Sequence, residues 1–155
     1  MITLRALKPT DNIALYSIYS NKKITRPAGF LPYQFQFNVD QQMSEFLETH
    51  TAIIYENQLI GVITKDQLDS SSISIGIMIH EKYWGKGIGK TALTQYINNL
   101  RNIDTIYADC ITKNIASQKL LESCGFIYQQ DFKRKFPDFI DEKTCKLYIK
   151  NKKRM

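Results

Sequence analysis

Histidine and cysteine are scarce in this sequence, and they are spaced too widely to form a metal site. There are two histidines, His50 and His80, and three cysteines, Cys110, Cys124 and Cys145. A metal centre requires several ligands brought together, commonly in pairs at short spacing. We therefore expect no metal, and we interpret the cysteines as buried, reduced thiols.

The chain also lacks a long hydrophobic run. No apolar stretch approaches the roughly 20 residues that a membrane span requires, and Pro9 and Asp11 come too early for a signal peptide. We therefore expect a cytoplasmic protein without membrane partners. Its 155 residues have the length of one domain and 43% are hydrophobic, so we interpret residues 1–155 as a single domain.

Acidic residues are fewer than basic ones, 15 against 21, which gives a formal net charge of +6 and suits an anionic ligand. Part of this excess lies in a terminal segment with Lys150, Lys152, Lys153 and Arg154. No aromatic residue that could stack on bases is interleaved there. We interpret this segment as a solvated, frayed end and expect no nucleic-acid partner.

The hydrophobic periodicity predicts a mixed α/β chain. Strands are expected over residues 2–7, 51–55, 59–64, 73–79, 103–111, 126–136 and 143–150. Helices are expected after Pro9, from an N-cap at Asn38 to the structural residue His50, and over 88–100 and 114–124. Residues 21–37 form either another short helix or a loop. The helix between strands 73–79 and 103–111 makes these two strands parallel, whereas the earlier strands form an antiparallel meander.

Glycine is scarce as well, with seven residues in all, but Gly85, Gly87 and Gly89 lie within five positions. They follow the alternating strand 73–79 and open the helix 88–100. Such a turn presents bare backbone N–H groups and the positive end of a helix dipole. A phosphate group is the ligand that this arrangement favours.

Two familiar phosphate-binding motifs fit this stretch incompletely. A Walker A loop matches only at its end, because Trp84 stands where its first glycine is required. A dinucleotide fingerprint can be placed on Gly87, Gly89 and Ala92, with Asp109 as the ribose ligand. In that motif, however, the first glycine follows the strand directly, and here several residues intervene. A nucleotide-dependent oxidoreductase is therefore the weakest alternative.

A third pattern, Gln/Arg-x-x-Gly-x-Gly/Ala, fits residues 84–89, with Trp84 in place of the usual Gln or Arg. A second motif, NIASQKLLESCGF over residues 114–126, is similar to Asn-x-x-Ser/Ala…Gly-Phe. With both motifs the chain resembles the GNAT superfamily of acyl-CoA-dependent N-acyltransferases. The segment YWGKGIGKTAL looks most like the branch of ribosomal-protein N-terminal acetyltransferases.

This resemblance implies a fold and an activity. The fold would be a mixed, mostly antiparallel sheet of about seven strands, splayed between its two central parallel strands and flanked by helices. The activity would be transfer of an acetyl group from acetyl-CoA, as cosubstrate, to a primary amine of a small molecule or a protein N-terminus, by a monomer or homodimer. The alternative is a CoA-binding sensor or interaction module without turnover.

The resemblance also implies the residues that bind the cofactor. They are Met78, Ile79, Trp84, Gly85, Lys86, Gly87, Ile88, Gly89, Lys90, Asn114 and Ser117. The glycine turn would hold the pyrophosphate, and a backbone N–H of Met78 or Ile79 would bind the thioester oxygen. Asn114 caps its helix and also reaches the cofactor arm or a nearby water.

Catalytic and acceptor residues can be nominated as well. By resemblance Ser117 protonates the thiolate, with Tyr128 as the fallback acid. His80 and Glu81, at the end of the polar side of the strand, are the candidate bases, acting directly or through water. For the acceptor we nominate three residues, Arg26, Phe30 and Tyr33. Alternatively the aromatic residues of this segment simply cover the edge of the core.

Overall fold

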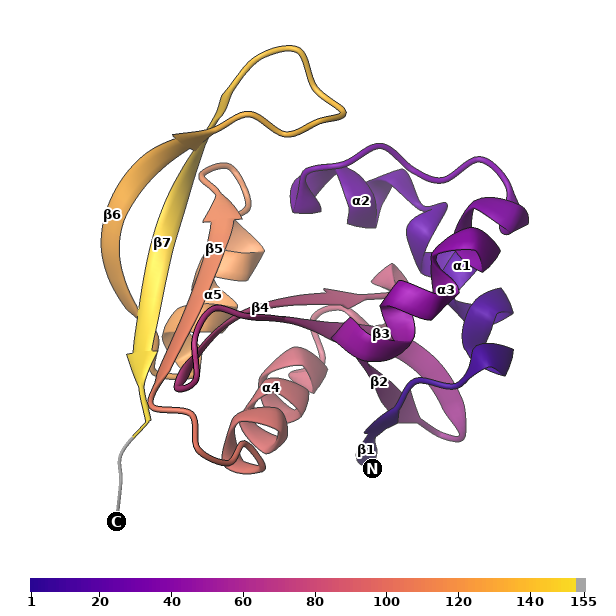
Figure 1. Cartoon of the computed structure of the whole chain (residues 1–155), viewed down its shortest axis with the longest axis horizontal. Helices are drawn as coiled ribbons and strands as arrows, with labels where there is room; N and C mark the ends of the chain where they lie inside the picture. The colour runs from indigo at the N-terminus through magenta and orange to yellow at the C-terminus, as the bar shows by residue number, and fades with distance from the viewer. Residues whose placement is uncertain (153–155) are drawn as a thin grey trace.

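The computed structural model describes residues 1–152, which form a seven-stranded sheet with helices on both faces (Figure 1). The strands are β1 (Ile2–Ala6), β2 (His50–Tyr55), β3 (Gln58–Gln67), β4 (Ser72–Ile79), β5 (Thr105–Ile111), β6 (Ile127–Arg134) and β7 (Lys143–Asn151). The helices are α1 (Asn12–Tyr19), α2 (Lys22–Ala28), α3 (Gln36–Thr49), α4 (Ile88–Asn98) and α5 (Ile115–Ser123), with short 3-10 turns η1 (Pro9–Asp11) and η2 (Glu81–Tyr83).

The strand order is β1-β2-β3-β4-β5-β7-β6, and β4 and β5 are its only parallel pair among the described residues. Two parallel neighbouring strands need a crossover connection, and α4 supplies it here. The predicted mixed, mostly antiparallel α/β sheet is therefore confirmed.

The alternation along β4 separates two apolar layers. Ile73 and Ile75 are buried on the face that α4 and α5 cover, together with Ile106 and Ala108 of β5. Met78 lies on the opposite face and packs against the cluster that α1, α2 and α3 build. Because neighbouring side chains in a strand point to opposite faces, each residue of β4 and β5 can be assigned to one layer.

Two local expectations change, and one open choice is settled. The third helix begins earlier than predicted, because Phe35 is its N-cap and Asn38 accepts the Phe35 N–H from inside the first turn, at 3.0 Å. The terminal basic segment was expected to fray, but its residues up to Lys152 are part of the fold, since the Lys152 N–H donates to the Asp104 carbonyl at 2.8 Å. Lys153 and Arg154 lie outside the described residues. Residues 22–28 are helical, which resolves the open choice there.

His50 has the structural role expected for it, and its burial predicts a pH-dependent stability. The ring is 8% exposed, and it contacts the Tyr19 hydroxyl at 2.6 Å and the Thr49 hydroxyl at 2.9 Å. Burial lowers its pKa to about 4, whereas a histidine in the unfolded chain has a pKa near 6.5. The stabilisation by neutral His50 is therefore complete above about pH 6.5 and is lost as the pH falls to about 4.

We expect the free energy of unfolding to fall by about 3 kcal/mol over this interval. Urea unfolding at a series of pH values measures it, and His50→Gln, which does not titrate, is expected to remove this slope. The Arg5 guanidinium lowers the pKa of Asp11, so that carboxylate titrates at lower pH and does not interfere. An unchanged slope in His50→Gln would contradict the assignment.

Candidate functional site

The two parallel strands separate halfway along their length. β4 and β5 pair over four residues, and the last pair is Ile75 with Ala108. Beyond it β4 continues to Ile79, paired only with β3, and β5 continues to Ile111, paired only with β7. We call the unpaired region between residues 76–79 and residues 109–111 the split. It confirms the splayed sheet expected from the resemblance.

Backbone groups of alternate β4 residues face the split. The His80 N–H donates to Ile60 at 2.8 Å, and the Ser72 carbonyl accepts from Leu68 at 3.0 Å, so even-numbered residues turn their backbone groups toward β3. By the alternation of an antiparallel pair, Ile77 and Ile79 turn theirs toward the split. Of the two residues nominated for the thioester oxygen, Met78 turns its N–H toward β3, whereas Ile79 turns its N–H toward the split.

The glycine turn has the conformation and the free space that a ligand requires. Gly85 and Gly87 adopt left-handed φ values of +73° and +74°, and a Cβ added to either would meet no atom within 4 Å. Gly87 is the N-cap of α4 and contributes no side-chain cap, so the first N–H groups of α4 lack internal partners. A Cβ on Gly89 would be 3.4 Å from Ile79 and from Leu120, which places the turn beside β4 and α5.

The other side chains of the turn have different environments. Lys86 lies over the Tyr83 ring, 5.8 Å from its centroid, whereas Lys90 is exposed at the start of α4. The Ile88 side chain is buried in the core, so only its backbone can contact a ligand. Trp84 is half exposed, and its indole N–H donates to the Ile79 carbonyl at 2.8 Å.

The start of α5 lies just beyond the end of β5. Asn114 is the N-cap of this helix, and its side-chain oxygen accepts the Ser117 N–H at 3.2 Å. Ser117 is half-buried in the first turn. Tyr128 lies two strands away from β5, roughly 10 Å in the sheet, and its hydroxyl donates to Asp131 at 2.8 Å. Ser117 therefore lies in the first helical turn after β5, whereas Tyr128 lies on the edge strand β6, with β7 between it and β5.

The two residues nominated as bases lie at the end of β4. Glu81 accepts from Asn21 at 2.9 Å and pairs with Lys23 at 3.2 Å; these two contacts lower the pKa of its carboxyl group. These contacts attach η2 to the start of α2. His80 accepts the Lys82 N–H through Nδ1 at 3.2 Å, which leaves Nε2 for another partner.

Asp109, considered from the sequence only as a ribose ligand, lies where the two parallel strands separate. It follows Ala108, the last β5 residue paired with β4, and it lies on the face opposite Ala108, the face that carries α1 to α3. Arg134 binds its carboxylate through two bonds, of 2.9 and 3.1 Å. A charged residue inside the alternating strand 103–111 was the sequence signal for it.

The residues nominated for the acceptor are divided between solvent and core. Arg26 is exposed at the end of α2. Phe30 and Tyr33 pack around Tyr19, with ring centroids 5.5 and 5.0 Å from it, which supports the alternative that these aromatics cover the core. Burial and nearby acidic groups raise the pKa of Tyr33.

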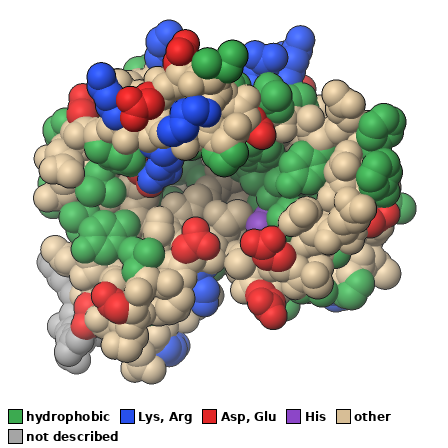
Figure 2. Space-filling view, turned by 45° about the horizontal axis from the view of Figure 1, so that its top comes forward, with side chains coloured by type: hydrophobic (Ala, Val, Ile, Leu, Met, Phe, Trp, Pro, Cys, Tyr) green, Lys and Arg blue, Asp and Glu red, His purple; other side chains and the backbone are tan. Residues whose placement is uncertain are grey.

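Two loops meet above the split. Gly29, which ends α2, lies against the Phe136 ring, so close that a Cβ would be 2.4 Å from it, and the Leu31 N–H donates to Asp138 at 2.9 Å. The β6–β7 loop therefore contacts the α2–α3 loop. Figure 2 shows a hollow on this side of the molecule, with basic side chains above it, acidic ones below it and hydrophobic ones at its sides.

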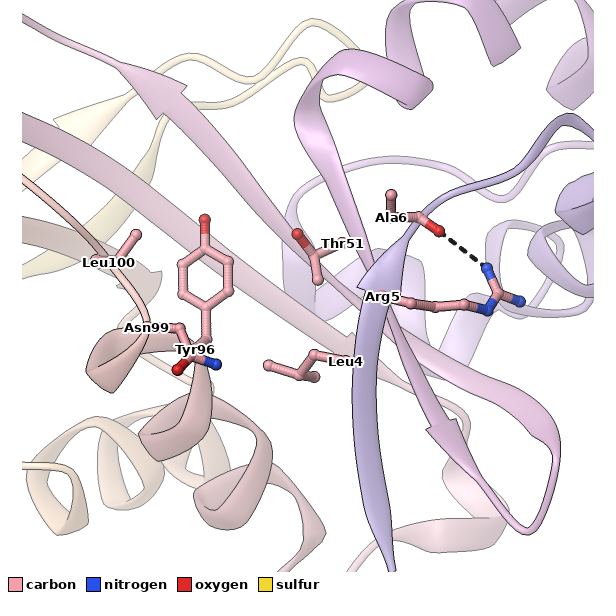
Figure 3. A pocket seen from close by; sticks show the side chains of 7 residues that line it. All are labelled: Leu4, Arg5, Ala6, Thr51, Tyr96, Asn99 and Leu100. Atoms are coloured by element: carbon pink, nitrogen blue, oxygen red, sulfur yellow. Dashed lines mark hydrogen bonds between the residues drawn. The ribbon is translucent and has the colours of Figure 1, made fainter.

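A separate depression of about 250 Å³ lies at the edge of the sheet (Figure 3). It is lined by Leu4, Arg5, Ala6, Thr51, Tyr96, Asn99 and Leu100. Asn99 and Leu100 follow the end of α4, whereas the glycine turn precedes its start, roughly 16 Å away along the helix. This depression is therefore distinct from the split.

Within residues 1–152 no group of three His, Cys, Asp or Glu side chains could hold a metal ion. The same part of the chain contains no helix long and apolar enough to cross a membrane.

Comparisons with known proteins agree on the fold. The family model described as "Acetyltransferase (GNAT) domain" matches residues 1–127. Spermidine N-acetyltransferase from Vibrio cholerae, solved with CoA and spermine, has 19% identity and a TM-score of 0.84, with 97% of this chain and 95% of that chain covered. A GNAT-family acetyltransferase from Bacillus anthracis has 19% identity and a TM-score of 0.85, with 97% and 94% covered.

A ribosomal-protein-alanine N-acetyltransferase from Brucella melitensis is also similar, with 20% identity, a TM-score of 0.78, and 96% of this chain and 99% of that chain covered. No curated protein sequence matches the chain.

Proposed function

Because the chain belongs to the GNAT acetyltransferase family, we propose that it transfers an acetyl group from acetyl-CoA to the primary amine of a small molecule or a protein N-terminus. The observation that carries this proposal is the split beside the glycine turn. Ile77 and Ile79 direct backbone groups into the split, and the turn directs N–H groups outward next to it. Together they match a cosubstrate with a pyrophosphate and an amide-bearing arm.

The residues of the turn would bind the pyrophosphate, because N–H groups at the start of α4 and the helix dipole favour an anion. Gly85 and Gly87 would let the backbone approach it closely. The N–H groups of Ile77 and Ile79 would bind the arm and the thioester oxygen. Acetyl-CoA supplies the activated acetyl carbon that the amine nitrogen attacks, with cleavage of the bond from carbon to sulfur.

Two proton transfers remain for the protein. The attacking ammonium group must lose a proton, and Asp109 is the carboxylate beside the split on the face where α2 and the β6–β7 loop meet. The leaving thiolate must gain a proton, and Ser117, at the start of α5, is the candidate donor. His80 is less suited to accepting the ammonium proton, because its Nδ1 accepts the Lys82 N–H and the Nε2 of the neutral ring then carries the proton.

The loops above the split bear on the size of the amine that can reach the site. The contacts of Gly29 with Phe136 and of Leu31 with Asp138 narrow the approach on this side. This favours a compact amine over a long folded substrate. One similar enzyme acts on spermidine and another on a ribosomal-protein alanine, so both classes belong in the test. We also propose that residues 1–155 form one domain that acts in the cytoplasm as a monomer or homodimer.

The experiment is a thermal-unfolding titration with acetyl-CoA, followed by CoA release with a panel of amines and N-terminal peptides. At 100 times Kd a ligand stabilises by about 2.7 kcal/mol, which should raise Tm by roughly 5 °C or more. No shift would overturn the proposal. If acetyl-CoA raises Tm but CoA is released with none of the amines or peptides, the protein is a CoA-binding module without turnover.

Replacing Ser117 by alanine is expected to lower kcat about tenfold and to change KM for acetyl-CoA less than about threefold, because the hydroxyl acts mainly in the transition state. Initial rates at saturating amine measure both constants. Ser123→Ala is the matched control on the same helix, since the Ser123 hydroxyl lies at the far end of α5, where it donates to the Leu120 carbonyl and contacts the Cys124 sulfur. An unchanged kcat in Ser117→Ala would assign thiolate protonation to solvent.

A further inference from the structure

The indole of Trp84 connects the two halves of the cofactor site. Its N–H donates to the carbonyl of Ile79, the last residue of β4, at 2.8 Å. Trp84 itself directly precedes Gly85, where the glycine turn begins. The hydrogen bond therefore spans η2 and attaches the start of the turn to the end of the strand.

This bond restricts the orientation of the peptide unit between Ile79 and His80. The Ile79 carbonyl faces the split and has no strand partner there, whereas the His80 N–H of the same peptide donates to Ile60 of β3 at 2.8 Å. With the indole in place, both polar groups of this peptide are bonded. The orientation of the preceding Ile79 N–H, which faces the split, is restricted as a result.

The residue type at this position is consistent with a donor function. The pattern that fits residues 84–89 has glutamine or arginine where this chain has Trp84. Glutamine, arginine and tryptophan differ in size and charge, but each has a side-chain N–H donor. A side-chain N–H donor is the property that the three residue types share.

We propose that Trp84 is a positioning residue that holds the glycine turn and the Ile79 N–H in register, so that the phosphate end and the arm of acetyl-CoA bind simultaneously. This inference rests on the proposed function. It differs from a direct contact with the cofactor, because Trp84 acts through the peptide of Ile79. The hydrogen bond supplies preorganisation in the ground state, so its loss should appear mainly in cofactor affinity.

The test uses Trp84→Phe, which keeps an aromatic ring without the donor, and Trp84→Gln, which restores a donor. A net hydrogen bond contributes about 1 kcal/mol, so Trp84→Phe is expected to raise KM for acetyl-CoA about fivefold while kcat changes less than about twofold. On a logarithmic scale, the KM of Trp84→Gln for acetyl-CoA should lie at least halfway back from that of Trp84→Phe to that of the wild type. Tyr83→Phe is the matched control, because it removes only the neighbouring bond from Tyr83 to Gln58.

A direct readout is available because the chain contains one tryptophan. In the wild type, its single indole N–H resonance should be protected from exchange, and its fluorescence should respond to CoA. Equal KM values in wild type and Trp84→Phe, or a Trp84→Gln enzyme no better than Trp84→Phe, would overturn the inference. If acetyl-CoA binds no variant and does not stabilise the wild type, the proposed function itself fails.

Discussion

Replacing Gly87 by valine is expected to lower the affinity for acetyl-CoA about 100-fold or more. Gly87 has a φ of +74°, a conformation that is strained for a β-branched residue by about 1–2 kcal/mol. If the backbone relaxes, the N–H groups at the start of α4 turn away from the pyrophosphate. If it does not, the valine side chain occupies the open space where the ligand must approach.

The measurement is the shift in Tm caused by acetyl-CoA, which should disappear in Gly87→Val. A Cβ at this position meets no atom within 4 Å, so the unliganded fold should persist, and circular dichroism checks this. Gly89→Ala is the control, because its added carbon would lie at ordinary contact distance, 3.4 Å, from Ile79 and Leu120. It should retain affinity within about threefold. A normal shift in Gly87→Val would remove the turn from the cofactor site.

The elements that form the proposed cofactor half of the site could be predicted because their signals are local. The alternation of Ile73, Ile75, Ile77 and Ile79 identified a strand, and the glycines after it identified a turn that opens a helix. Asn114 likewise caps the helix that directly follows its strand. In each case the residues that define the element are close neighbours in the sequence. The sequence alone is therefore enough to recognise the element.

The acceptor half depends on contacts between distant residues. Arg134 is 25 positions from Asp109, and Asp138 is 107 positions from Leu31. No periodicity records such pairs, and only the sheet order brings β6 near β5. The backbone direction at Met78 was missed for a related reason, because the face of a strand residue can be read from its side chain, whereas the direction of its N–H depends on the register with β3.

The early aromatic segment illustrates a different limit. Phe30 and Tyr33 have the composition of a binding wall, yet they surround Tyr19 in the core. A sequence shows that aromatic side chains must pack somewhere but not against what. Here the chain after α2 turns both rings toward Tyr19, and Gly29, at the end of α2, lies against the Phe136 ring of the β6–β7 loop.

Replacing Asp109 by asparagine is expected to lower kcat about 100-fold, the contribution typical of a general base, and to leave acetyl-CoA binding within about threefold. Asparagine keeps the size of the side chain but cannot accept the ammonium proton. Steady-state rates with the best amine of the panel measure kcat, and the thermal shift measures binding. Asp131→Asn is the matched control, because Asp131 is also ion-paired, to Lys146 at 3.4 Å, but lies on β6 away from the split.

Arg134 separates a catalytic role of Asp109 from a structural one. The guanidinium binds the carboxylate through two bonds, so Arg134→Met removes the ion pair but keeps the carboxylate, and it should keep kcat within about threefold of the wild type while Asp109→Asn does not. An ion pair that served only to join β5 to β6 would change Tm in both variants and kcat in neither. If Asp109→Asn turns over within about threefold of the wild type, Asp109 is only the partner of Arg134, and the proton passes to water.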